Sequence, residues 1–368
     1  PTPLTGFLSR TMARSLRRHV QPEVTMTQAS VPPLPRRLSW LPLLLVVIGA
    51  AAYASSFQGV FILDDKRNIL ENPALHHLWP LTTFLRQSTR PLVDLTFALN
   101  YLVGGVNPIG YHAVNAAIHV AAGMVLCGFL RLTLCMPRFQ TSSGQTSTWL
   151  AFVSALLWVV HPLNTQSVTY VIQRAESLTG LCYFSTLYCL ARGTRTPTPH
   201  RWYAMSVGCC ALGMASKAIM VTAPLMALLY DATFLAGSVR EAWRKRRGFY
   251  ISLAATWVLL GKIAPHLVAG KNIGFGMEHV TPLAYLTTQF GVIVHYLRLA
   301  CWPHPLVLDY GWQIPMTPEA IWPPALLLAA LVTGTLVLLS RSRPLVQNSS
   351  TAGAGVEPAA PTFRASSP

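Results

Sequence analysis

The chain has 368 residues, of which 52% are hydrophobic and only 11% are charged, whereas an ordinary soluble domain carries about 25% charged residues. This composition excludes a soluble globular protein and is typical of an integral membrane protein, because several apolar stretches approach the ~20 residues that cross a bilayer as a helix. The net charge of +16 does not indicate nucleic-acid binding, because the basic residues lie in the N-terminal tail and in short connections, as in cytoplasmic loops.

Two polar tails frame one predicted membrane domain. Residues 1–38 are basic and interrupted by prolines, so we expect a disordered cytoplasmic tail. Residues 341–368 are rich in Ser, Ala and Pro and predict a disordered C-terminal tail. The apolar runs between them assign residues 39–340 to a single transmembrane domain.

The first six predicted spans place the basic connections on one side of the membrane. They cover residues 39–57, 111–134, 149–163, 172–191, 202–216 and 219–236. With the N-terminus inside, the loop from 58 to 110 lies outside the cytoplasm. The densest basic segment, VREAWRKRRG, follows the sixth span and lies inside, in agreement with the positive-inside rule.

After a seventh span at 249–266, two interpretations stay open for residues 282–302. This segment is either another crossing or an amphipathic helix on the outer surface. A cytoplasmic position of Arg341 and Arg343 favours the surface helix, followed by a last span at 321–340. The predicted fold is therefore an all-α polytopic membrane protein with about eight to nine transmembrane helices and a long first extracytoplasmic loop.

Charged side chains beside apolar spans are costly, so each is a candidate functional residue. Most of them map to the outer side: Asp64, Asp65, Arg90, Glu176, Lys217 and Asp309. The adjacent Asp64 and Asp65 have two readings. They are solvated charges that cap a helix beginning near Asn68, or they bind a divalent cation or supply a general base.

Two further segments carry polar residues at the outer ends of spans. In GYHAVNAAIH, the residues His112, Asn115 and His119 share one helical face, where they form interhelical hydrogen bonds or contribute to a site. The segment 161–177 carries His161, Arg174 and Glu176. Because residues two apart on a helix do not face each other, Arg174 and Glu176 should each have a partner elsewhere.

Six blocks in order resemble the membrane region of a known family. They are FILDDKRNILENP, TRPLVDLTFALNY, NPIGYHAVNAAIH, HPLNTQSVTYVIQRAES, SKAIMVTAPLMALLYD and RLACWPHPLVLDYGW. They resemble the protein O-mannosyltransferase-like family, in which many members carry tetratricopeptide repeats after the membrane domain. The similarity covers about residues 51–312. That family is similar to the GT-C glycosyltransferases, multi-span enzymes whose active site faces the ER lumen or the periplasm.

The resemblance implies a GT-C-like helical bundle that transfers a mannose-like hexose from a polyprenyl-phosphate donor to a protein or glycan hydroxyl on the extracytoplasmic side. The membrane is then a bacterial inner membrane, or the ER membrane in a eukaryote. The resemblance also implies site residues. Asp64 and Asp65 correspond to the acidic motif of the first outer loop, with Glu176 as its acidic companion.

The remaining site candidates follow from charge and side. Arg90, Arg174 and Lys217 are candidates for binding the donor phosphate. His112, His161 and Asp309 are further candidates. No cofactor follows with certainty, although Asp64 and Asp65 could hold Mg²⁺ or Mn²⁺.

Two departures from the family pattern leave other functions open. The family commonly reads Ser-Lys-Glu where this chain has Ser216, Lys217 and Ala218, and no repeat of 34 residues follows the membrane domain. A catalytically degenerate scaffold therefore stays open. A lipid or solute transporter is a third reading, but it predicts charges near the midplane and repeat symmetry between the halves.

Overall fold

The structure, a computed structural model, describes residues 36–80, 88–136, 139, 144–262, 281–312 and 317–341. Within these ranges every regular element is a helix or a helical turn, which confirms the all-α prediction for the described part of the chain. The predicted tails lie almost entirely outside the described residues, as do residues 263–266 of the predicted seventh span.

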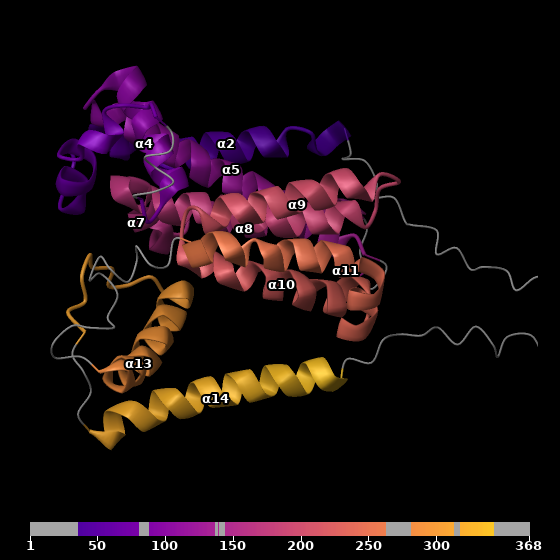
Figure 1. The fold of residues 1–368 in the computed structure, drawn as a ribbon. Coiled ribbons are helices and arrows are strands. Elements are labelled where there is room, and N and C mark those ends of the chain that lie inside the picture. The colour runs from indigo at the N-terminus through magenta and orange to yellow at the C-terminus, as the bar shows by residue number, and fades with distance from the viewer. Residues whose placement is uncertain are drawn as a thin grey trace, which may run out of the picture.

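A bundle of roughly aligned helices forms the body of the molecule (Figure 1). It consists of α2 (Leu41–Ala52), α5 (Pro108–Leu134), α6 (Gly144–Val159), α8 (Arg174–Gly193), α9 (Pro199–Met214), α10 (Ala223–Tyr230) and α11 (Val239–Ala255). Helix α8 packs against both α5 and α9. The bundle therefore has α8 at its centre, and the residues that begin α8 lie where several helices meet.

Helix starts follow ordinary capping chemistry. Proline occupies the first turn of α5, and the side chain of Asn107 accepts a hydrogen bond from the backbone N–H of Ile109. Ser238 caps α11 in the same way, at the N–H of Glu241. Such side chains satisfy backbone donors that have no partner within the helix, so the sequence itself fixes where these helices begin.

The described residues contain three helical segments long and apolar enough to cross a membrane, Pro108–Leu134, Ala218–Leu235 and Pro318–Leu339. A fourth results if Gly144–Val159 and Pro162–Thr169, which are bent by 48°, form one broken span. Helices also occupy the other predicted span positions, but α2 has only 12 residues and α8 begins with Arg174 and Glu176. The predicted number of eight to nine spans therefore stays a prediction.

The segment 58–110, predicted as the long first outer loop, contains helical elements of its own, and its position outside the cytoplasm stays a prediction. It contains α4 (Pro91–Gly104) and a short 3₁₀ turn at Pro73–Leu75, and the helix expected near Asn68 is a single π-helical turn, Lys66–Leu70. Phe61, Ile69 and Leu75 are buried with side chains of α4, α5 and α8. The apolar side chains within this charged segment cause it to pack as a cap on one end of the bundle.

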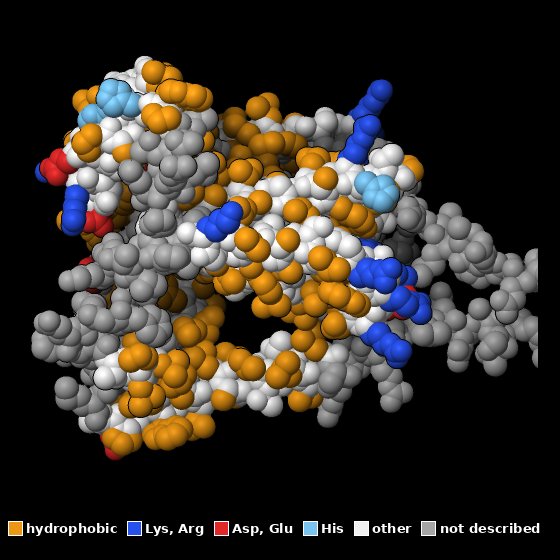
Figure 2. All heavy atoms as spheres, viewed as in Figure 1, with side chains coloured by type: hydrophobic (Ala, Val, Ile, Leu, Met, Phe, Trp, Pro, Cys, Tyr) orange, Lys and Arg blue, Asp and Glu red, His pale blue; other side chains and the backbone are white. Residues whose placement is uncertain are grey.

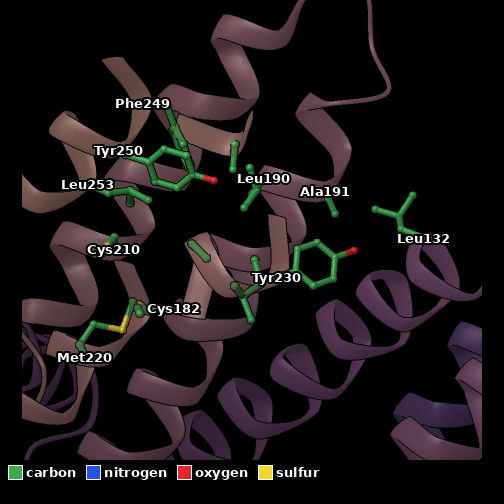
Figure 3. Packing of buried hydrophobic residues seen from close by; sticks show 14 of the residues in the cluster. Leu132, Cys182, Leu190, Ala191, Cys210, Met220, Tyr230, Phe249, Tyr250 and Leu253 are labelled. Carbon is green, nitrogen blue, oxygen red and sulfur yellow. The ribbon is translucent and has the colours of Figure 1, made fainter. Parts of the chain in front are cut away.

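The main core lies between α8, α9, α10 and α11. Figure 3 shows Tyr230 of α10 and Tyr250 of α11 among aliphatic and sulfur-containing side chains from the neighbouring helices. Small residues permit the close approach: Ala191, Ala223 and Ala227 have no exposed surface. Apolar packing and close helix contacts join the four helices, together with polar contacts such as that of Arg246 with Asp231.

The charged groups divide between the two ends of the bundle. Lys and Arg gather where α11 begins, and most visible Asp and Glu lie at the opposite end (Figure 2). Helix α11 starts ten residues before the predicted seventh span, so the basic segment predicted as a loop is helical, with non-helical dihedral angles at Arg246. The side of the membrane on which each end lies stays a prediction.

Helices α13 (Pro282–Cys301) and α14 (Pro318–Arg341) pack against each other, and α14 lies apart from the main bundle in Figure 1. The window of α14 that qualifies as a span is not buried by protein, as expected of a helix that faces lipid. Helix α13 is not among the candidate spans of the described residues. Its position on the outer surface stays a prediction.

Candidate active site

Asp65 connects the first outer segment to the start of α8. Its side chain is fully buried; Oδ2 accepts a hydrogen bond from the Ile62 N–H at 3.1 Å and Oδ1 accepts one from the Ile172 N–H at 2.8 Å. Burial raises the pKa of Asp65, and the Asp64 charge adds to this, while the backbone hydrogen bonds act in the opposite direction. Both carboxylate oxygens of Asp65 thus accept hydrogen bonds that stabilise the local backbone.

Asp64 has a different environment although it is the adjacent residue. It is exposed, and its backbone N–H donates to the hydroxyl of Tyr170 at 3.0 Å. No hydrogen bond or ion pair of its carboxylate is found among the described residues. Of the two aspartates, only Asp64 has a carboxylate that can reach a substrate.

A cavity of about 300 Å³ lies beside this segment. We call it the tyrosine pocket, since Tyr170, Tyr296 and Tyr310 contribute to its wall together with Ile62. Ile62 and Tyr170 both contact the aspartate pair, through Asp65 Oδ2 and the Asp64 N–H respectively. The tyrosine pocket therefore lies beside the segment that carries Asp64, which touches the wall residue Tyr170 through its backbone N–H.

A second cavity of about 360 Å³ adjoins the first, and we call it the glutamate pocket. Glu176, Gln173 and His119 contribute to its wall, and Gln166, Leu163 and Tyr296 belong to the walls of both cavities. Two molecules bound in the two pockets would therefore be separated only by these shared side chains.

Glu176 forms an ion pair with Lys217, which precedes the 3₁₀ turn Ala218–Thr222. The side chains are 38% and 31% exposed, so the pair is accessible from the solvent. Burial and the nearby Arg90 guanidinium lower the pKa of Lys217 to about 8, although contact with a carboxylate by itself favours the charged ammonium. The structure thus brings together three of the predicted residues, Arg90, Glu176 and Lys217.

Asp94 also belongs to this charged group, and the sequence analysis did not single it out. Its Oδ2 accepts a hydrogen bond from Ser88 Oγ at 2.6 Å, and it interacts electrostatically with Arg90. The N–H of Leu92 donates to the Ala215 carbonyl at 3.1 Å, which holds the start of α4 against the end of α9. Asp94 is the one acidic residue in the mostly apolar block TRPLVDLTFALNY. This isolated acidic charge was the signal that could have identified it.

Arg174 is occupied inside the protein. It is fully buried, and its guanidinium donates to Asn115 Oδ1 at 2.6 Å, to Thr96 Oγ1 at 3.2 Å and to the Tyr111 carbonyl at 3.1 Å. It also lies 4.3 Å from the centroid of the Phe97 ring. The expectation that Arg174 and Glu176 have separate partners is confirmed, and the burial of Arg174 conflicts with its predicted role at a donor phosphate.

The side chains of the remaining candidates take part in local structure. His112 is buried against Gly59. His161 caps a 3₁₀ turn by accepting from the Leu163 N–H. Asp309 accepts from the Gly311 N–H within its own turn. None of these contacts brings the three residues to Glu176 or Asp64.

Asn115 and His119 form the interhelical hydrogen bonds considered for this helix face. The Asn115 amide donates to the carbonyls of Val168 and Val171, both at 3.2 Å, and a ring nitrogen of His119 lies 2.9 Å from the Val159 carbonyl. Asn115 is therefore structural, whereas His119 also contributes to the wall of the glutamate pocket.

Among the residues that the structure describes, no group of three or more His, Cys, Asp or Glu side chains could hold a metal ion. Asp65 does not fit the predicted role of a metal ligand, since backbone N–H groups occupy both of its oxygens. Asp64 alone supplies too few ligands for Mg²⁺ or Mn²⁺, which prefer several oxygen atoms.

Comparison with known proteins identifies relatives. The chain is 28% identical over 297 residues to Drosophila melanogaster protein O-mannosyl-transferase Tmtc2. The aligned region covers 73% of this chain and 30% of that protein. It is 33% identical over 156 residues to mouse protein O-mannosyl-transferase TMTC3, covering 39% of this chain and 16% of the relative. The chain is homologous to the protein O-mannosyl-transferases. The predicted resemblance is thereby confirmed.

The homology concerns a limited part of these relatives. Human protein O-mannosyl-transferase TMTC4 is 27% identical over 216 residues, 52% of this chain and 29% of that protein, so the chain spans less than a third of the curated relatives it matches. No family model and no solved structure matches the chain. The similarity to protein O-mannosyl-transferases is thus a similarity of sequence over one region.

Proposed function

We propose that the chain is a membrane glycosyltransferase, or the membrane region of one, that transfers a mannose-like hexose from a polyprenyl-phosphate donor to a protein or glycan hydroxyl. The homology to protein O-mannosyl-transferases supports this reaction class. The single structural observation that carries the proposal is the pair of adjoining pockets, one beside the exposed Asp64 and the other beside Glu176 and Lys217.

The two pockets suit two substrates of different charge. The tyrosine pocket has an aromatic wall and a carboxylate nearby, which suits an acceptor whose hydroxyl must lose a proton. The glutamate pocket adjoins Lys217 and Arg90, two cations that can neutralise a phosphate. We therefore place the acceptor in the tyrosine pocket and the donor phosphate at the cations beside the glutamate pocket.

Transfer proceeds in one inverting step in this proposal. Asp64 takes the proton from the acceptor hydroxyl, the hydroxyl oxygen bonds to the anomeric carbon, and the bond from that carbon to the phosphate oxygen breaks with its electron pair on the phosphate. Lys217 and Arg90 stabilise the negative charge of the departing phosphate. Asp65 holds the segment in place, and Glu176 positions the Lys217 ammonium.

We extend the proposal to the finer expectations from the sequence. The helices fold as a GT-C-like bundle of eight to nine spans in an ER or bacterial inner membrane, with the two pockets on the extracytoplasmic side. The gathering of Lys and Arg at the opposite end of the bundle supports this orientation.

Incubation of the purified full chain with polyprenyl-phosphate mannose and a hydroxyl-bearing acceptor tests the function. We expect mannose to leave the lipid at the same rate with and without a chelator, because both Asp65 oxygens accept backbone hydrogen bonds and Asp64 alone supplies too few oxygen ligands for a divalent cation. Loss of turnover in the chelator, restored by Mg²⁺ or Mn²⁺, would contradict the proposed metal-free mechanism. Absence of turnover with every polyprenyl-phosphate sugar would contradict the function.

The second candidate is a degenerate scaffold, and one observation favours it. The position after Lys217 is Ala218 and carries no carboxylate, while Glu176 is engaged by Lys217. A scaffold would bind the polyprenyl-phosphate sugar without consuming it. Equilibrium binding of the donor, measured beside its consumption, separates the two candidates.

A further inference from the structure

A third cavity lies at the end of the bundle remote from the candidate active site. Its volume is about 610 Å³, and it lies between the first turns of α9 and the middle of α11. Helix α9 has 16 residues and therefore rises ~24 Å between this cavity, near His200, and Lys217 just beyond its other end. We call the cavity the basic pocket, and it has no side chain in common with the two pockets described above.

The wall of the basic pocket is apolar on one part and cationic on another. Ala204, Val207 and Phe249 supply apolar surface, and His200, Lys245 and Arg246 supply polar nitrogen atoms. No Asp or Glu belongs to this wall. A ligand that fits it has an anionic part and an apolar part.

The first half of α11 carries more positive charge than its acids can neutralise. It contains Arg240, Arg244, Lys245, Arg246 and Arg247 against the single acid Glu241. Glu241 pairs with both Arg244 at 2.9 Å and Lys245 at 3.2 Å. Lys245 is 45% exposed on its side chain, so its ammonium can approach a ligand in the pocket. This cluster is visible where α11 begins in Figure 2.

Arg246 is held in place more firmly than its neighbours. Its Nη1 donates to both oxygens of the fully buried Asp231 at 2.7 Å, and its Nε donates to the Tyr203 hydroxyl at 3.1 Å. The side chain is 14% exposed, and Nη2 has no hydrogen-bond partner among the described residues. The irregular backbone of α11 at Arg246, with φ −134° and ψ 30°, brings the guanidinium to Asp231 while leaving one donor group available.

The position of the basic pocket relative to the membrane identifies the ligand. The candidate span Ala218–Leu235 ends three residues before the cap of α11 at Ser238, so the pocket lies at the level where a bilayer changes from acyl chains to headgroups. Cations at this level attract the phosphate of anionic lipids, and an adjacent apolar wall accommodates the upper part of an acyl chain. We propose that the basic pocket binds the phosphate-bearing headgroup of an anionic phospholipid.

The test compares lipid selectivity of the full chain in bilayers of phosphatidylcholine that contain spin-labelled phosphatidylglycerol or spin-labelled phosphatidylcholine. We expect the immobilised fraction of the label to be larger for phosphatidylglycerol. Lys245→Gln should reduce this preference about fivefold, the equivalent of ~1 kcal/mol for one cation near an anionic surface. Arg244→Gln is the matched control, because Arg244 pairs with the same Glu241 but is not part of the pocket wall.

A charge-neutral variant tests the pocket itself. Gly248 belongs to its wall, and a Cβ added there would meet no atom within 4 Å, so Gly248→Leu fills the cavity without changing any charge. We expect it to abolish the preference for phosphatidylglycerol with an unchanged Tm. Equal losses in Lys245→Gln and Arg244→Gln, or an unaffected Gly248→Leu variant, would overturn the proposal in favour of general surface attraction. Displacement of the lipid by millimolar inorganic phosphate would overturn it in favour of a soluble anion.

Discussion

Replacement of Asp65 by alanine should destabilise the protein without removing the proposed general base. The substitution leaves the N–H groups of Ile62 and Ile172 without their buried acceptor. A hydrogen bond to a charged group contributes about 1.5–3 kcal/mol, and relief from burying a carboxylate offsets part of the loss of two such bonds. We therefore expect a net cost of about 2–4 kcal/mol.

Thermal unfolding of the purified chain in detergent measures this effect. One kcal/mol shifts the Tm of a 150–250-residue domain by about 2–4 °C, so the Tm should fall by several degrees in Asp65→Ala. Asp65→Asn keeps one acceptor oxygen and should lose about half as much. Asp64→Asn is the control and should leave the Tm unchanged, since its carboxylate is exposed. An unchanged Tm in Asp65→Ala, or an equal fall in Asp64→Asn, would refute the division of roles between the two aspartates.

Three other predictions concern the remaining groups of the site. Lys217 is charged below its pKa of about 8, so the transfer rate should fall as the pH rises through about 8. Glu176→Gln should move this fall to lower pH, because the carboxylate that favours the charged ammonium is gone. A rate profile that is flat from pH 7 to 9 would contradict this role of Lys217. Arg174→Met should lower the Tm by the equivalent of about 3–5 kcal/mol, because three acceptors lose their buried charged donor and relief from burying the guanidinium offsets only part of that loss, and an unchanged melting curve would rule out this structural role. Tyr170→Phe should cost only about 0.5–1.5 kcal/mol of stability. It should lower kcat more than it raises KM, because the Tyr170 hydroxyl fixes the Asp64 backbone. An unchanged kcat in steady-state kinetics would contradict this positioning role.

The sequence predicted the helical class and most helix positions because apolar runs and prolines at helix starts are local signals. The helix α5, expected at 111–134 and found at Pro108–Leu134, has such signals at both ends. The helix α4 was missed because its 14 residues are too few for a span and the surrounding charges favoured a loop. Its position depends on burial of Phe97 against Tyr111 and on the Leu92 hydrogen bond to Ala215, which are contacts between distant parts of the chain.

The candidate site was predictable in composition but not in the roles of its residues. Charge and predicted side indicated Arg90, Glu176 and Lys217, and these lie together. The sequence could not distinguish Asp64 from Asp65, because adjacent residues share every local signal and differ only in the direction of their side chains. The same holds for Arg174, whose partners come from α4 and α5, so only the packing of three helices determines that its guanidinium is internal.

The most direct test of the account is mannose transfer by Asp64→Asn measured beside Glu71→Gln. Glu71 is an exposed acid of the same outer segment, but its backbone N–H donates to the Lys66 carbonyl, whereas that of Asp64 donates to the pocket residue Tyr170. A positioned general base contributes typically 10² to 10⁴ in rate, so Asp64→Asn should lose at least a hundredfold of the transfer rate at unchanged Tm, while Glu71→Gln keeps the wild-type rate. Full transfer activity in Asp64→Asn would contradict the assignment of Asp64 as the general base of a glycosyltransferase.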